Sequence, residues 1–148
     1  MKAKRLNALS KSMLIGIMVS LIMVSFSSYA KKIPFIKSSV APAAEGYVKV
    51  KNDNNNNYVI KIRISNLAEV ERLEPQKQTY IVWMVTEKGV KENIGRINSS
   101  NNLNVSFETV SSYQPIQIFI TAEVDESVQY PSELILLTTD KFWKNSPE

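Results

Sequence analysis

The chain has 148 residues, with 18 basic and 14 acidic side chains and neither histidine nor cysteine. Without these two residue types, Ser-His-Asp and Cys-His nucleophiles, zinc sites of the usual type and disulfide bonds are all excluded. The four basic residues within the first thirty account for the whole positive excess, so the rest of the chain is neutral and offers no electrostatic case for a nucleic-acid partner.

Residues 1–30 predict a helical secretory signal peptide. A basic start precedes an uncharged apolar run at 13–26, and the small residues Ser28 and Ala30 occupy the −3 and −1 positions before Lys31. The run is shorter than the roughly 20 residues that cross a bilayer as a helix, which favours cleavage over an uncleaved anchor. Because the composition is rich in Asn, Lys and Ile and lacks cysteine, we expect a bacterial protein exported to the periplasm or extracellular space, with no membrane span after cleavage.

The first part of the mature chain predicts a lead-in and a hairpin. Residues 31–45 contain two prolines and no sustained period, so we expect an extended lead-in. An alternating strand at 47–51 is followed by the Asn-rich turn 52–57, since Asn and Asp accept turn conformations readily. The return strand at 58–64 is apolar on alternate residues. The polar stretch 65–78 then interrupts the strands as an unusually long loop.

Residues 79–86 predict the central strand of the domain. Successive side chains of a strand point to opposite faces, and here both alternations are apolar. One alternation comprises Ile81, Trp83 and Val85, and the other comprises Tyr80, Val82 and Met84. Such a pattern indicates a strand that is covered on both sides.

The remaining mature chain predicts four further short strands and no helix. They are expected at 93–97, 103–107, 116–122 and 133–138. Gly95 interrupts the first of them and indicates a β-bulge. About seven antiparallel strands separated by turns are typical of an all-β, immunoglobulin-like β-sandwich, which we place at 46–140 with a tail at 141–148.

The central strand also predicts an interaction face. A tryptophan on the third strand of such a sandwich usually fills the core, so we expect Trp83, Ile81 and Val85 to point inward with Ile116, Ile118 and Ile120. The face formed by Tyr80, Val82, Met84 and Phe119 would then point outward. Exposed apolar patches usually mark binding sites, which predicts that this face binds another protein chain, with self-association as one form. The alternative is that the 65–78 loop or the 31–45 lead-in covers it.

Acidic residues form two candidate sites for carboxylate chemistry. Glu123, Asp125 and Glu126 lie close together in an expected loop, and Asp53 stands among asparagines. Either group offers oxygen ligands of the kind that calcium prefers, but neither has the spacing of a known calcium loop. We therefore expect solvated loops and turns, with no catalytic residue, metal or cofactor.

The motifs resemble the extracytoplasmic domain of anti-sigma-K factors over residues 46–140. The matching segments are Tyr80-Ile81-Val82-Trp83-Met84-Val85, Gly89, Ile94-Gly95-Arg96-Ile97, Ile120-Thr121-Ala122-Glu123 and Tyr130-Pro131-Ser132. The resemblance implies the sandwich fold. Only twelve residues precede the apolar run, so we expect no sigma-binding half and do not carry sigma regulation over from the resemblance.

Two functions follow as expectations. The first is an exported, non-enzymatic module that binds a protein or another component of the cell envelope. The second is an anti-sigma-like sensor domain of the envelope.

Overall fold

The computed structural model describes Met13, residues 30–97 and residues 104–143. The predicted signal peptide, apart from Met13 and Ala30, lies outside these residues, as do the first residue of the strand expected at 103–107 and the end of the tail. Within them lie eight strands: β1 (Lys31–Ile36), β2 (Glu45–Asn52), β3 (Tyr58–Ser65), β4 (Thr79–Thr86), β5 (Lys91–Ile97), β6 (Val105–Ser111), β7 (Pro115–Glu123) and β8 (Ile135–Thr139). No helix in the described part is long and apolar enough to cross a membrane.

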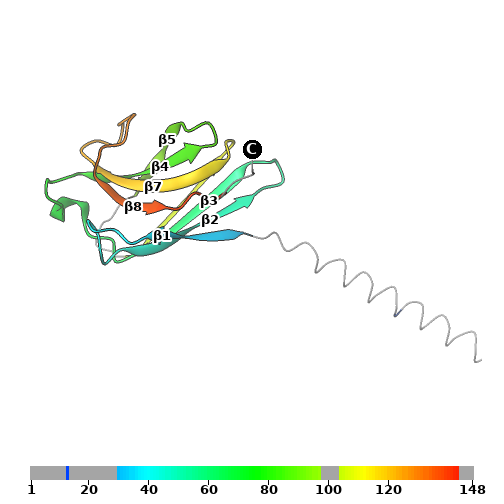
Figure 1. Ribbon diagram of the computed structural model, residues 1–148, viewed down its shortest axis with the longest axis horizontal. Helices are drawn as coiled ribbons and strands as arrows, with labels where there is room; N and C mark the ends of the chain where they lie inside the picture. The colour runs from blue at the N-terminus through cyan, green and yellow to red at the C-terminus, as the bar shows by residue number, and fades with distance from the viewer. Residues whose placement is uncertain (1–12, 14–29, 98–103, 144–148) are drawn as a thin grey trace, which may run out of the picture.

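The strands form one antiparallel sheet that curls into two facing layers. Its order is β5-β4-β7-β8-β1-β2-β3-β6, and the β5-β4-β7-β8 half lies over the half that contains β1, β2 and β3 (Figure 1). The edge strands β5 and β6 approach each other, so the sheet nearly closes into a barrel. This arrangement confirms the all-β sandwich, and β2–β8 correspond to the seven expected strands.

The eighth strand, β1, corrects the expected lead-in at 31–45. Residues 31–34 pair with β2, whereas Phe35 and Ile36 pair with β8, so β1 joins the two layers. Pro34, which has no N–H to donate, lies at the point where the strand changes partner. Ile33 and Phe35 point into the core. The proline concealed this short alternation in the sequence.

The main core lies between the two layers. Alternate residues of each strand point inward because successive side chains leave opposite faces of a sheet. The fully buried members include Val48, Ile60, Ile62, Tyr80, Val82, Met84, Ile118 and Ile120. Leu67 and Val70 join them from the β3–β4 connection, which contains a 3-10 helix at Val70–Arg72. Phe142 is also buried here, so the domain extends into the residues expected as a tail.

Gly95 closes the gap between the edge strands. The pairing of β4 with β5 is irregular between Val82 and Trp83, opposite this glycine, which confirms the predicted bulge. Gly95 has φ +141°, and a Cβ there would lie 2.8 Å from Cε2 of Phe107 on β6. The Phe107 ring therefore packs where any other residue would place its side chain.

We expect Gly95→Ala to lower the free energy of unfolding by about 1–3 kcal/mol, the usual cost of a strained backbone position. Gly89→Ala is the matched control, because Gly89 also has a positive φ, +77°, but a Cβ there meets nothing within 4 Å. Urea denaturation of both variants measures the difference. An equal or smaller loss in Gly95→Ala would show that Phe107 does not close the gap.

Candidate functional site

The predicted interaction face is wrong, because its residues are buried. Tyr80, Val82 and Met84 have no exposed surface and belong to the main core. Phe119 does not share their face; it lies on the opposite side of the sheet with Ile81 and Trp83. No part of this set is available to a partner, so neither protein binding nor self-association is supported here.

The pairing register between β4 and β7 explains the inversion. Val82 is paired with Ile120 and Trp83 with Phe119, so each pair shares a face. Ile118 and Ile120 point into the core as expected, and the register places the even-numbered side of β4 with them. A shift of one residue moves a whole strand face from inside to outside.

The β3–β4 connection covers one end of the core, which is the alternative considered for the loop at 65–78. Leu67 and Val70 pack into the core, and the Tyr80 hydroxyl donates a hydrogen bond of 3.0 Å to the carbonyl of Ala68. Burial raises the pKa of Tyr80 to about 12, and the negative charge of Glu71 adds to the rise. The phenol is therefore a neutral structural donor that ties the loop to β4.

Trp83 is fully buried, as predicted, but in a second cluster on the outer side of β4 and β7. Its ring stacks on Phe119, with centroids 6.2 Å apart. The connection between β7 and β8 covers it with Val128, whose carbonyl accepts a hydrogen bond from the Asn93 side chain of β5. Glu126 of the same connection forms an ion pair with Arg96. The loop is thus held across the face that was expected to be internal.

A buried polar chain runs beneath this loop. The Trp83 indole N–H donates to the Thr121 hydroxyl at 2.8 Å, and that hydroxyl donates to the Glu123 carboxylate at 2.5 Å. The same carboxylate oxygen accepts the Ser132 backbone N–H at 2.8 Å. Glu123 is only 3% exposed, which corrects the expectation of a solvated residue. Its role is to anchor the returning loop.

The other acidic candidates organise their own turns. Asp53 accepts the backbone N–H groups of Asn55 and Asn57, and these bonds lower the pKa of its carboxyl group. Asp125 accepts both the backbone N–H and the hydroxyl of Ser127, which likewise lowers its pKa. No group of three acidic side chains in the described part of the chain is placed to hold a metal ion.

The strongest candidate site is the outer surface of β1, β2 and β3. Its cations are Lys32, Lys49, Lys51, Lys61 and Arg63, all exposed, and we call them together the cationic face. The outward residues of these strands and of β6 include only two carboxylates, Glu45 and Glu108. Although residues 31–148 are neutral overall, their charges are therefore segregated in space.

Three lysines of this face stand in one row across the sheet. Lys49 is paired directly with Lys32 on one side and with Lys61 on the other. Like charges placed opposite each other destabilise a sheet. Of the five cations, only Lys61 has its charge neutralised by an ion pair, at 3.0 Å from Glu108. Among the described residues, no carboxylate lies within ion-pair distance of the other four.

Tyr47 lies at one end of the cationic face, opposite Arg63, and its ring contacts two of the lysines. The ammonium groups of Lys32 and Lys49 lie 4.1 and 5.6 Å from its ring centroid. Beside the ring is an open hollow of about 420 Å³. Its lining is Lys32, Pro34, Phe35, Lys37, Ala44, Glu45, Gly46, Tyr47, Arg63 and Ser65. An anionic group in it would meet three cations.

Sequence reasoning missed this site, although a signal was present. The exposed alternation of residues 47–51 and 58–64 is mainly basic, but net charge alone gave no reason to examine it. The chain matches no family model, no curated protein and no solved structure. The site therefore rests on its own geometry.

Proposed function

We propose that this protein is an exported, non-enzymatic binding module that attaches to the bacterial cell envelope through the cationic face. Export rests on the signal-peptide pattern of residues 1–30. The non-enzymatic character rests on the lack of His and Cys and on the structural roles of Glu123, Asp53 and Asp125.

The observation that carries the proposal is the row of three lysines across β1, β2 and β3. A sheet gains nothing from this row by itself, because directly opposed like charges repel each other. An anionic ligand on this surface would neutralise the row and turn the repulsion into binding energy. The sensor alternative has no comparable support and stays a prediction from sequence resemblance.

The test is retention of the protein on the cell envelope. The full chain, produced with its own amino-terminal segment in a bacterial host, should fractionate with the envelope and be released by high salt, since salt screens exposed charges. Lys49→Glu should move most of it to the unbound fraction. The thermal midpoint should stay equal or rise, because the substitution replaces two like-charge pairs by two opposite-charge pairs.

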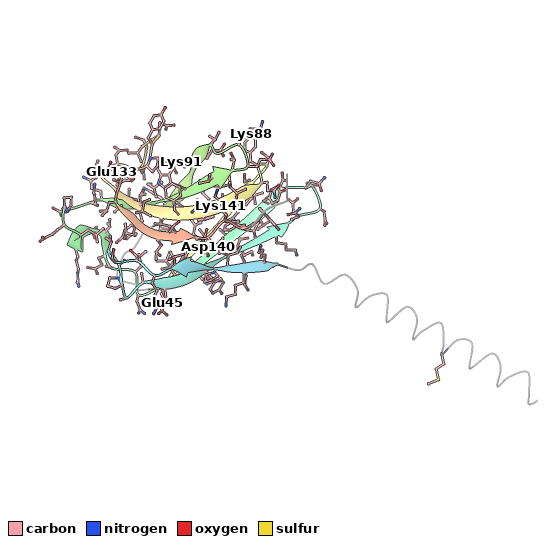
Figure 2. All side chains as sticks on the ribbon, viewed as in Figure 1. Glu45, Lys88, Lys91, Glu133, Asp140 and Lys141 are labelled. Carbon is pink, nitrogen blue, oxygen red and sulfur yellow. The ribbon has the colours of Figure 1, made fainter. Side chains whose placement is uncertain are left out.

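Lys88→Glu is the matched control. Lys88 follows β4 on the opposite side of the molecule from Glu45 at the start of β2 (Figure 2). This variant makes the same change of net charge and should leave retention unchanged. If wild-type protein is not retained, or if both variants lose retention equally, the cationic face is not the contact surface.

A further inference from the structure

The cations of the cationic face indicate the chemistry of its ligand. Four of the five are lysines, whose ammonium groups act as compact point charges, unlike the planar fork of arginine, which grips one carboxylate or one phosphate with two parallel hydrogen bonds. Lysines set on neighbouring strands lie about 4.8 Å apart in steps across the sheet. A row of point charges therefore fits a flexible chain that carries repeated tetrahedral anions better than it fits a ligand with a single planar anionic group.

We propose that the ligand is a linear phosphodiester polymer without bases, of the poly(glycerol phosphate) type; this inference rests on the proposed function. Its phosphates would lie along the row of Lys32, Lys49 and Lys61, and one of them would enter the hollow beside Tyr47. In the hollow it would meet Lys32, Lys37 and Arg63.

The aromatic content of the face argues against a nucleic acid. Proteins that bind single strands offer aromatic rings on which successive bases stack. Tyr47 is the only aromatic residue of the described outward positions on β1, β2 and β3, and two lysine ammonium groups already lie close to its ring. Tyr47 is therefore a positioning residue for the lysines and not a stacking platform.

A substitution of Glu45 should change binding in the opposite direction to Lys49→Glu. It lies at the start of β2 and lines the hollow together with the cations (Figure 2). A carboxylate there opposes a bound phosphate by Coulomb repulsion. Glu45→Gln keeps the side-chain shape and removes the charge, so it should tighten binding of a polyanion, whereas Lys49→Glu should weaken it.

The experiment titrates the purified exported protein with defined poly(glycerol phosphate) and measures the binding constant K by calorimetry at several salt concentrations. The ligand meets four described cations that have no ion pair, namely Lys32, Lys37, Lys49 and Arg63. They predict a slope of log K against log[salt] of about −3, or about 60-fold weaker binding at 200 mM than at 50 mM salt. Lys49→Glu should make the slope shallower by about 1. Tyr47→Leu should weaken binding about two- to fivefold, and Tyr47→Phe should not, because the phenyl ring still holds both ammonium groups.

Three other probes decide the chemistry of the ligand. Polygalacturonate, a carboxylate polymer, should bind at least tenfold more weakly than poly(glycerol phosphate) under the same conditions. A single-stranded oligonucleotide and vesicles with anionic phospholipids should also bind more weakly. Equal or tighter binding of any of these three would overturn the phosphodiester assignment.

The two proposals fail in different ways. If wild-type protein is retained on envelopes and Lys49→Glu is not, but poly(glycerol phosphate) does not bind, the ligand class is wrong and the proposed function stands. If wild-type protein is not retained at all, the proposed function fails. Binding of purified poly(glycerol phosphate) that does not respond to Lys49→Glu or Glu45→Gln would place the contact elsewhere and overturn this inference.

Discussion

Replacing Val82 with Lys should leave the chain unfolded. Val82 has no exposed surface and lies in the core between the two layers, where an ammonium group would be taken out of water without a partner. The penalty for an unpaired buried charge is at least several kcal/mol, and a domain has only about 5–15 kcal/mol of stability in total. Circular dichroism and thermal unfolding of the purified variant measure the outcome.

Val110→Lys is the control for this substitution. Val110 is also a strand valine, but it is 57% exposed on the outer side of β6, so the same change should leave the fold intact. A folded Val82→Lys protein would show that this side of β4 faces solvent. That result would restore the interaction face first expected at Tyr80, Val82 and Met84.

Trp83→Ala should lower the free energy of unfolding by about 3–5 kcal/mol, the range for large aromatic side chains removed from a core. The substitution removes the stacking partner of Phe119 and leaves a cavity beneath the β7–β8 connection. It also removes the indole N–H that donates to Thr121. Denaturant titration followed by circular dichroism gives the value.

Trp143→Ala tests whether burial, and not the loss of any tryptophan, causes this effect. The Trp143 indole also donates a hydrogen bond, to the carbonyl of Pro115, but the side chain is 46% exposed. We expect a loss of about 1 kcal/mol, the typical net worth of one hydrogen bond. A Trp83→Ala protein as stable as Trp143→Ala would mean that the β7–β8 connection does not seal the outer face of β4.

Much of the local structure could be predicted from the sequence. The alternating residues of β2 and β3, the Asn-rich turn between them and the doubled apolar pattern of β4 all appear where they were expected. The bulge at Gly95 was also predicted correctly. Each of these features depends on neighbouring residues, through side-chain alternation or through the conformations that Asn and Gly accept.

The sequence could not decide which side of β4 faces the core, because both sides are apolar. That choice depends on the pairing of Trp83 with Phe119 and on the two connections that cover the strand, with Leu67 on one side and Val128 on the other. The sequence also could not indicate that β1 is a strand. This short segment contains Pro34 and belongs to the sheet only through its pairing with β2 and β8.

The candidate site shows the same division between sequence and structure. Alternation in the sequence determined that Lys49 and Lys51 share a face, as Lys61 and Arg63 do. Only the structure fixed the register of this hairpin, which pairs Lys49 with Lys61, and added Lys32 from a strand that the sequence did not indicate. The physical reason is that side-chain alternation acts within one strand, whereas a surface charge pattern also depends on the register between paired strands.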